Sequence, residues 1–305
     1  MRRINGKDFS KPPKVLLRPG AKTKINQSCI NGNGKSYNGN HYKHIDVKIE
    51  LKKYSLGLLK LPEDANAKCY YCESTIEVGA SLQVEHYRPK DAVDKEDTNG
   101  NPYAGYYHLG LEWTNLLLAC ANCNGSGAKG TRFPIKYNRA IQFNPILTNS
   151  ILDRTKLKAS SSELLSEGPL LINPEIQEPD THFTYSSSGN IKGKTEEGRT
   201  TGSILKLDRI LLRKARIDVL RSYINMFNAF IVSHKRNPSA GWAMFDDLVE
   251  GVCKQMIDDS NNLELTYIQW RKFICSHFIL TVLPQIDINY RIRVYLIYRD
   301  IKRRN

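Results

Sequence analysis

The sequence lacks long apolar runs, an apolar leader and internal repeats. No stretch of the 305 residues approaches the roughly 18 consecutive apolar residues that a membrane-spanning helix requires. The first seven residues, Met-Arg-Arg-Ile-Asn-Gly-Lys, have none of the apolar character of a signal peptide. We therefore expect a globular cytoplasmic protein, long enough to hold one large domain or two modest domains.

Excess charge is absent from the middle of the chain and concentrated at its two ends. The formal net charge is +14. Residues 1–60 hold 14 Lys and Arg against 3 Asp and Glu, residues 291–305 hold 6 against 1, and the segment between them is close to neutral. Two basic ends on a neutral body favour a polyanionic partner such as nucleic acid, bound through its phosphates. A solvated basic surface has the same composition.

Four of the seven cysteines form two Cys-x-x-Cys pairs, Cys69 with Cys72 and Cys120 with Cys123. In a reducing cytosol such pairs are more typical of a metal site than of disulfides, and four thiolates complete the tetrahedral shell of one structural zinc ion. The 47 residues between Cys72 and Cys120 exceed the gap of an ordinary zinc ribbon, so this loop must contain structure of its own. The other cysteines are expected in the core: Cys29, Cys253 and Cys275.

Polar groups suited to catalysis lie between and just after the two cysteine pairs. Glu85 and His86 are adjacent, and Asn124 directly follows the last cysteine. Carboxylate and amide oxygens suit a hard cation such as magnesium or manganese. A neutral histidine, with an ordinary pKa of about 6.5, can take a proton from water. Trp113, by contrast, is expected to be a core residue rather than a platform for stacked bases.

Four segments around the cysteines carry a distinctive pattern. They are Cys-Tyr-Tyr-Cys-Glu at 69–73, Val-Glu-His-Tyr-Arg-Pro-Lys at 84–90, Glu-Trp-Thr-Asn-Leu-Leu-Leu-Ala-Cys-Ala-Asn-Cys-Asn at 112–124 and Lys-Gly-Thr-Arg-Phe-Pro at 129–134. Together they resemble the HNH endonucleases of anti-phage defence, a subgroup that contains the PtuB component of Septu systems and the HNH proteins of some retrons. The similarity is specific over 69–134 and weaker over the rest of 45–220.

The resemblance implies an α+β fold with a ββα-metal core of the HNH (His-Me finger) type, in which a hairpin carries the histidine and a helix carries the last ligand. It implies His86 as general base and Asn115 as the brace of the histidine loop. It also implies Glu85 and Asn124 as ligands of a catalytic magnesium or manganese ion. Many HNH enzymes have Asp or His where this chain has Glu85, and His where it has Asn124.

The same resemblance implies partners and leaves the substrate open. It implies metal-dependent cleavage of DNA beside an ABC- or SMC-like ATPase of the PtuA type, with a reverse transcriptase in a retron context. Nothing in the motif distinguishes DNA from RNA, so an RNase is a second hypothesis. A third is a zinc knuckle that binds nucleic acid without catalysis, which would not need His86, Asn115 and Asn124 together. Four basic residues are candidate phosphate contacts or ordinary surface charges: Arg88, Lys90, Lys129 and Arg132.

The composition divides the chain into three expected parts. Residues 1–60 are expected to form a basic arm with a lead-in helix, 61–150 the HNH nuclease domain with its zinc knuckle, and 151–305 a hairpin and a mainly helical region that docks a partner. Within the first 200 residues we expect a helix over 47–60, a loop over 91–105, a buried strand over 168–174 and a hairpin over 182–194. In the rest of the chain we expect a helix from an N-cap at Ser203 to about 233, helices over 241–258 and 263–282, and a strand or helix over 286–294.

Overall fold

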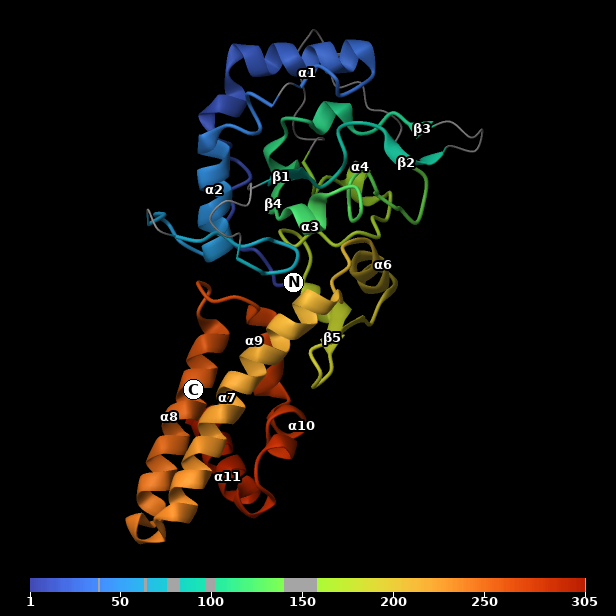
Figure 1. Ribbon diagram of the computed structural model, residues 1–305. Coiled ribbons are helices and arrows are strands. Elements are labelled where there is room, and N and C mark those ends of the chain that lie inside the picture. The colour runs from blue at the N-terminus through green and yellow to red at the C-terminus, as the bar shows by residue number, and fades with distance from the viewer. Residues whose placement is uncertain (38, 63–64, 76–82, 97–101, 140–157, 305) are drawn as a thin grey trace. The chain divides into compact units, whose positions relative to one another are not determined.

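The computed structural model contains two compact units, which are described separately. The first unit comprises Met1–Phe183 and Gly193–Leu207, and the second comprises Thr184–Lys192 and Asp208–Asn305. Figure 1 follows the chain through its elements. The expected boundary at residue 150 lies outside the described residues. The residues that the structure describes are 1–37, 39–62, 65–75, 83–96, 102–139 and 158–304.

The N-terminal segment is folded, which corrects the expectation of a loosely structured arm. Helix α1 spans Pro19–Asn31 and begins with a proline, whose fixed φ suits the first helical turn. It stops at Gly32, which takes the left-handed conformation (φ 62°) that glycine adopts without strain. The expected helix over 47–60 is α2, Ile45–Leu56, which ends at a second left-handed glycine, Gly57. The buried residues of α1 are Ala21, Ile25, Ser28 and Cys29.

Charge pairs anchor the first seven residues in the first unit. The Met1 amino group lies 2.9 Å from the Glu73 carboxylate. Lys7 Nζ lies 3.0 Å from the Glu175 carboxylate and donates a hydrogen bond of 2.7 Å to the carbonyl oxygen of Leu116. The side chains of Lys7 and Glu175 are only 1% exposed. These positive charges therefore stabilise the fold and are not available to nucleic acid.

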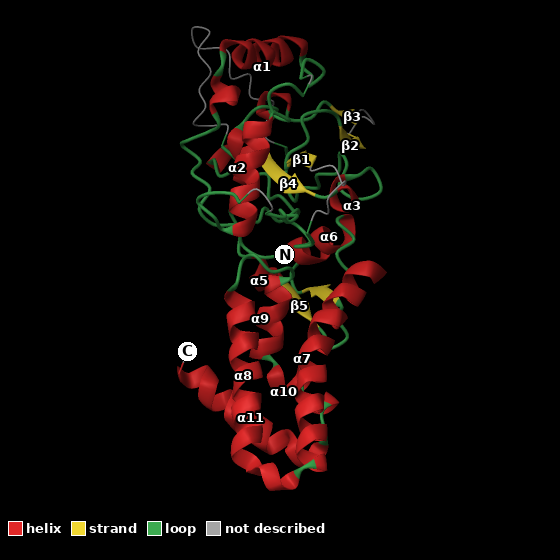
Figure 2. Ribbon diagram, turned by 60° about the vertical axis from the view of Figure 1, so that its left-hand side comes forward, coloured by secondary structure: helices red, strands yellow, loops and turns green. Residues whose placement is uncertain are grey.

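The centre of the first unit is a two-stranded antiparallel sheet followed by a short helix. Strand β1, Gln83–His86, pairs with β4, Leu116–Ala119, and places Glu85 opposite Leu117. All four residues of β4 are buried. Helix α3, Ala121–Asn124, begins two residues after the end of β4 and contacts β1. Figure 2 shows β1 and β4 side by side in yellow.

Two short strands occupy part of the expected loop over 91–105. Strands β2, Val93–Glu96, and β3, Pro102–Tyr103, pair antiparallel with an irregular register. The segment 97–101 between them lies outside the described residues. The prediction of a loop is therefore wrong over 93–96 and 102–103, where the backbone groups pair.

The segment over 168–174 is buried only from 171 onward and is not the expected strand. It forms an isolated bridge between Pro169 and Ile135, and Ile172 donates its backbone N–H to Thr201 Oγ1 at 2.8 Å. The Ile172 side chain is fully buried, as the apolar run predicted. A side chain thus satisfies a backbone group that a neighbouring strand would otherwise pair.

Beyond this segment the hairpin is confirmed and one helix start is wrong. Strands β5, Phe183–Tyr185, and β6, Ile191–Gly193, form the hairpin expected over 182–194. Ser203 is not an N-cap, because it lies within α6, Glu196–Ile204. The long helix expected to end near 233 is α7, Ile210–Arg236, which follows Arg209 and has no side-chain capping hydrogen bond. Helix α6 has its own cap, Thr195, whose hydroxyl accepts a hydrogen bond from the backbone of Gly198 at 3.1 Å. Two short helices precede these elements, α4 at Ser162–Leu165 and α5 at Pro179–His182.

The second unit is mainly helical, as the sequence predicted. The segment over 286–294 alternates apolar and polar residues, but its buried residues beyond 288 recur at helical spacing, which confirms the helical alternative. Those buried residues are Tyr290, Val294, Tyr298 and Ile301. The helices are α7 (Ile210–Arg236), α8 (Gly241–Asn261), α9 (Ile268–Ser276), α10 (Phe278–Thr281) and α11 (Ile288–Arg304).

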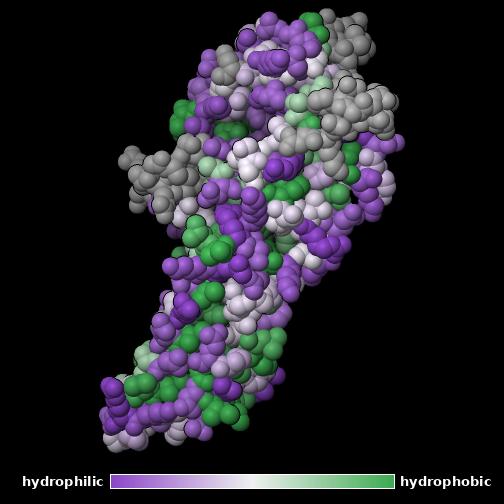
Figure 3. All heavy atoms as spheres, turned by 45° about the vertical axis from the view of Figure 1, so that its right-hand side comes forward, coloured by the Kyte–Doolittle hydropathy of each residue, from purple (hydrophilic) through white to green (hydrophobic). Residues whose placement is uncertain are grey.

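The surface of the second unit carries apolar side chains among its polar ones, which appear in green in Figure 3. Among the described residues, no helix combines the length and the apolar character that crossing a bilayer requires. The buried residues of α11 recur at helical spacing, so this helix is amphipathic, with one face packed in the bundle. Large exposed apolar side chains include Ile210, Leu211, Ile279, Leu280, Ile288 and Ile292.

Candidate active site and metal centre

The two Cys-x-x-Cys pairs converge on one point. Cys69 and Cys72 lie in a tight turn before β1, and Cys120 and Cys123 lie at the junction of β4 and α3. All four sulfur atoms lie within 4.8 Å of one another, and Cys72 Sγ is 3.8 Å from Cys120 Sγ. A tetrahedral zinc ion with bonds of about 2.3 Å separates its sulfur ligands by about 3.8 Å. The four thiolates therefore fit a structural metal ion such as zinc.

The other cysteines and Trp113 lie where the sequence placed them. Cys29, Cys253 and Cys275 are buried, and burial raises the pKa of each of these three thiols. They therefore stay protonated and behave as small apolar side chains. Trp113 is 2% exposed and packs in the core.

His86, the last residue of β1, lines a cavity in the first unit. Its Nε2 lies 2.9 Å from the carbonyl oxygen of Gly110. A carbonyl can only accept, so Nε2 must carry the ring proton, and Nδ1 of the neutral ring keeps an unprotonated lone pair. Burial lowers the pKa of His86 to about 3, despite the opposing effect of the Gly110 carbonyl. The imidazole is therefore neutral at physiological pH, which is the form that accepts a proton.

Glu85 precedes His86 in β1, and its carboxylate is buried next to an ammonium group. The Glu85 side chain is 5% exposed and forms an ion pair through Oε1 with Lys129 Nζ. Burial raises the pKa of Glu85, and the charge of Lys129 opposes that shift. Lys129 Nζ also donates to the carbonyl oxygen of His86 at 2.8 Å. One lysine thus contacts the side chain of one candidate residue and the backbone of the next.

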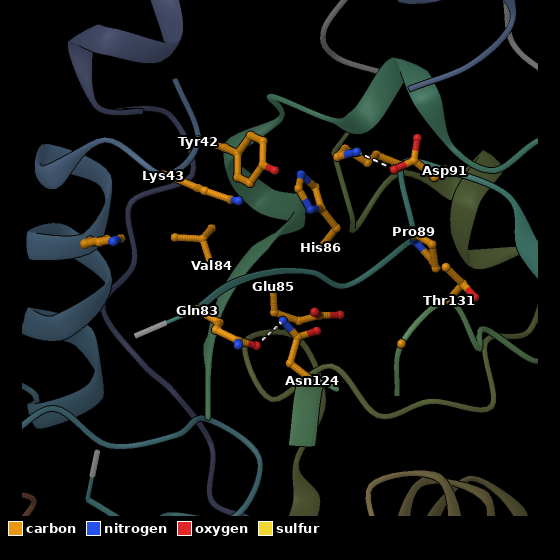
Figure 4. A pocket seen from close by; sticks show the side chains of 13 residues that line it. Tyr42, Lys43, Gln83, Val84, Glu85, His86, Pro89, Asp91, Asn124 and Thr131 are labelled. Atoms are coloured by element: carbon orange, nitrogen blue, oxygen red, sulfur yellow. Dashed lines mark hydrogen bonds and ion pairs between the residues drawn. The ribbon is translucent and has the colours of Figure 1, made fainter. Parts of the chain in front are cut away.

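Asn124 brings the end of α3 to the same cavity. Its Nδ2 donates to Gln83 Oε1 at 2.8 Å, which leaves Oδ1 as the acceptor atom of the amide. Figure 4 shows the Glu85 carboxylate and the Asn124 amide pointing toward one another, with His86 above them. Carboxylate and amide oxygens of this kind are ligands that magnesium and manganese take.

The cavity that these residues share has a volume of about 470 Å³. His86 forms one part of its wall, and the ring of Tyr42 packs edge-on against the imidazole with the ring centroids 4.7 Å apart. A hollow of this size is in the range of pockets that enclose small ligands. It is large enough to admit one phosphate group with its flanking sugars.

Asn115 lies outside the cavity and is fully buried. Its Oδ1 accepts a hydrogen bond of 2.8 Å from the backbone N–H of Arg88, and its Nδ2 donates to the Arg88 carbonyl oxygen at 3.0 Å. The Asn115 carbonyl oxygen in turn accepts from the Tyr87 N–H at 2.9 Å. Asn115 therefore holds the two residues that follow His86, which is the place of a brace.

Arg88 does not contact the cavity, which corrects the expectation that it binds phosphate. Its side chain is fully buried, its Nε lies 3.3 Å from Glu167 Oε2, and Nη2 donates to the carbonyl oxygen of Leu164 at 2.6 Å. The guanidinium also lies over the ring of Phe133, 5.2 Å from its centroid. Arg88 is a core residue, because a buried carboxylate compensates its charge.

The other three predicted phosphate contacts lie in different surroundings. Lys129 is enclosed by its contacts with Glu85 and His86, so it is also not free to grip a flanking phosphate. Lys90 lines the cavity but pairs with the adjacent Asp91. Arg132 is half-buried and donates to the carbonyl oxygen of Ala128. Only Lys90 of the four is at the cavity itself.

The structure adds cavity residues that the sequence did not single out. Tyr42, Lys43 and Lys48 come from the basic N-terminal segment, whereas Gln83 and Asp91 flank the Glu-His motif. The excess positive charge of residues 1–60 was the available signal for the two lysines. Residues 1–60 contain 14 basic residues, and the tertiary packing decides which of them face the site.

Comparison with known proteins supports the resemblance seen in the motifs. The chain is 33% identical over 182 residues to Septu protein PtuB of Bacillus mycoides (strain KBAB4), which is 59% of this chain and 52% of that protein. It is 30% identical over 156 residues to Septu protein PtuB of Bacillus thuringiensis, covering 50% and 41%. The chain thus spans about half the length of the PtuB relatives that it matches.

A third match is to a different Septu component. Over 216 residues the chain is 27% identical to Septu protein PtuA of Bacillus mycoides (strain KBAB4), which is 70% of this chain and 26% of that protein. No family model matches the chain. No solved structure matches it either.

The fold and the site define a protein of mixed helix and sheet, with a four-cysteine cluster that could hold a metal ion and a polar cavity in the same unit. The relatives narrow this class to one kind of protein. The chain is similar to the Septu PtuB proteins, which confirms the resemblance that its motifs indicated.

Proposed function

We propose that this protein is a metal-dependent endonuclease of the HNH type. The observation that carries the proposal is the placement of His86: its Nε2 is engaged by the Gly110 carbonyl, and its neutral ring lines the cavity that Glu85 and Asn124 also line. An imidazole held in one tautomer beside two oxygen ligands suits the activation of a water molecule. The strand order supports the same reading, since β1 carries His86, β4 pairs with it, and α3 carries Asn124.

In the proposed reaction His86 Nδ1 takes a proton from a water molecule as the water oxygen bonds to phosphorus. The bond from phosphorus to the leaving 3′ oxygen breaks, and that oxygen takes a proton from solvent. A phosphate in the cavity would raise the pKa of His86, because a nearby negative charge favours the imidazolium. Asn115 would keep the histidine loop in place through its hydrogen bonds to Arg88.

A divalent magnesium or manganese ion would be held by Glu85 and Asn124. When bound, it supplies positive charge to the phosphate oxygens and to the leaving group. Lys129 would keep the Glu85 carboxylate ionised in spite of its burial, so that the carboxylate stays a ligand. The four-cysteine cluster has no open position once it holds zinc, so we assign it a structural role.

The proposed substrate is DNA, because the similar Septu PtuB proteins belong to a group linked with anti-phage defence. An RNase on the same scaffold remains the second candidate, since the catalytic motif acts on a phosphodiester and does not distinguish DNA from RNA. A zinc-stabilised protein that binds nucleic acid without cutting it is the third. The convergence of His86, Glu85 and Asn124 on one cavity favours an enzyme over a binding protein.

The test is a cleavage assay with the purified protein and its His86→Ala variant. Each would be incubated with plasmid DNA and with structured RNA in magnesium or manganese, and then with EDTA. We expect metal-dependent cutting of DNA that the variant loses by at least about 100-fold, the usual size of a general-base contribution. Unchanged cutting by His86→Ala would refute the assignment, and metal-dependent cutting of RNA alone would establish the second candidate.

We further propose that the chain acts in an anti-phage defence system with an ATPase of the PtuA type, and that this takes place in the cytoplasm. In a retron context, which the motif resemblance leaves open, a reverse transcriptase would be a further partner. The second unit contains no catalytic motif and exposes apolar side chains, so we assign partner docking to its helices. Co-purification would test this: Ile279→Glu with Leu280→Glu should weaken the complex, whereas a complex of unchanged stability would contradict it.

A further inference from the structure

Two of the basic residues in the N-terminal segment lie at the cavity that contains His86. Lys43 precedes α2 and is exposed, and Lys48 lies one turn inside α2 and is half-buried. Lys7, by contrast, is enclosed by its ion pair with Glu175. The basic excess of residues 1–60 is thus divided between charges used in the fold and charges that face the cavity.

The charge around the cavity is positive once the ion pairs are taken into account. Glu85 is compensated by Lys129, and Asp91 is compensated by Lys90. Lys43 and Lys48 form no ion pair with any residue in the described part of the chain. Two ammonium groups therefore remain to attract an anion to this cavity.

Packing fixes the backbone of both lysines at the cavity that contains His86. Tyr42, the residue before Lys43, is 8% exposed and packs edge-on against the imidazole at 4.7 Å. Figure 4 shows the Lys43 side chain reaching toward His86 beneath the Tyr42 ring. Val47, the residue before Lys48, is fully buried and fixes the start of α2 in the core. Each ammonium group thus extends from a backbone position that a buried neighbour anchors.

We propose that Lys43 and Lys48 bind the phosphodiester backbone of the nucleic acid next to the phosphate that is cut. The inference rests on the proposed nuclease function and assigns the substrate contacts to these two lysines in place of Arg88 and Lys129. Ammonium groups recognise phosphate as point charges, without reading base sequence. Their effect is therefore a salt-dependent gain in affinity that is the same for every sequence.

The experiment measures binding separately from cleavage. The full chain, the double variant Lys43→Gln/Lys48→Gln and a matched double variant, Lys14→Gln/Lys22→Gln, would be titrated against a fluorescein-labelled DNA duplex in buffer without magnesium or manganese, which leaves the four-cysteine site undisturbed. Lys14 and Lys22 are exposed and do not line the cavity, so both double variants lose the same charge. Anisotropy would give the dissociation constant at a series of sodium chloride concentrations.

We expect Lys43→Gln/Lys48→Gln, the cavity variant, to raise the dissociation constant by about tenfold at low salt. It should also reduce the slope of log K against log salt by roughly 2, one unit for each lost phosphate contact. The Lys14/Lys22 variant should change the slope by much less. Lys43→Arg/Lys48→Arg keeps both positive charges and should restore the slope, which would show that the glutamine variant lost affinity through charge and not through misfolding. Equal losses in the two glutamine variants, or no DNA binding by the parent chain, would overturn the proposal.

The two proposals fail in different ways. If His86→Ala cuts as well as the parent chain while Lys43→Gln/Lys48→Gln still shows a reduced slope of log K against log salt, the catalytic assignment is wrong and the phosphate contacts stand. If His86→Ala abolishes cutting while the cavity variant binds DNA like the parent chain, the phosphate contacts are wrong and the nuclease stands.

Discussion

The side-chain amide of Asn115 pairs with the backbone of Arg88 on both of its polar sides, accepting from the N–H at 2.8 Å and donating to the carbonyl oxygen at 3.0 Å. The amide thus pairs the backbone N–H and carbonyl oxygen of Arg88, which a neighbouring strand would pair if β1 continued. The pairing lies two residues after His86 and holds the chain that leaves the cavity wall. Asn115 thus acts on the site through the backbone.

Replacing Asn115 with Asp should therefore lower the rate of cleavage without weakening substrate binding. Aspartate can accept from the Arg88 N–H but cannot donate to the Arg88 carbonyl, which is left unpaired beside a buried charge. We expect the turnover rate to fall by about 10- to 100-fold, with KM nearly unchanged, since misplaced catalytic groups lose rate rather than affinity. Asn190→Asp, on the hairpin of β5 and β6, is the control. An Asn115→Asp variant with unchanged turnover would contradict a positioning role.

The buried pair of Arg88 and Glu167 should be needed for stability and not for binding. Arg88→Met leaves the Glu167 carboxylate buried with the Tyr106 hydroxyl but without the guanidinium. Breaking such a pair costs about 3–5 kcal/mol. Urea denaturation should show this loss, and Arg88→Met/Glu167→Gln should recover part of it. A fully stable Arg88→Met variant with weaker DNA binding would instead restore Arg88 as a phosphate contact.

Removal of the structural metal should unfold the first unit. Binding of zinc by four thiolates contributes about 10–16 kcal/mol in isolated finger peptides, which exceeds the stability of most domains. We expect one zinc ion per chain by elemental analysis, loss of that ion in Cys120→Ser, and loss of the near-ultraviolet circular dichroism signal with a strong chelator. Cys253→Ser should retain the full zinc content. A Cys120→Ser variant with both zinc and fold intact would disprove the site.

Acidification should destabilise the protein in part through His108. Burial, with a smaller effect from Arg88, lowers the pKa of His108 to about 4. The unfolded chain binds this proton near pH 6.5, so the stability is complete above pH 6.5 and is lost as the pH falls toward 4. At pH 5 the loss is about 2 kcal/mol for this group.

His108→Phe should remove that part of the pH dependence. The difference in unfolding free energy between pH 7.5 and pH 5, measured in urea, should be about 2 kcal/mol smaller in the variant than in the parent chain. His86 titrates in the same direction, so some dependence will remain. His277→Phe, at an exposed position, should leave the difference unchanged. An equal difference in His108→Phe and the parent chain would rule out this contribution.

Local spacing was enough to predict the parts of the site that depend on short stretches of sequence. The two Cys-x-x-Cys pairs, the Glu85-His86 dipeptide and Asn124 lie where their neighbours along the chain place them, on turns, a strand and a short helix. Helix α1 was missed because its segment is rich in lysine and asparagine and its apolar residues are few. The sequence left strand and helix open over 286–294, because an alternating pattern and a helical stripe shared the same residues, and the packing of α11 selected the helix.

The sequence by itself determined the chemistry of this protein: four thiolates for one metal ion, a histidine beside a carboxylate, and a surplus of positive charge in the first 60 residues. The tertiary structure decided which charges are available for binding. Arg88 and Lys129 are enclosed because Glu167 and Glu85 lie against them, whereas Lys43 and Lys48 face the cavity and form no ion pair with a described residue. A charge is buried only when a distant residue compensates it, and that pairing is set by the packing of segments far apart in the chain.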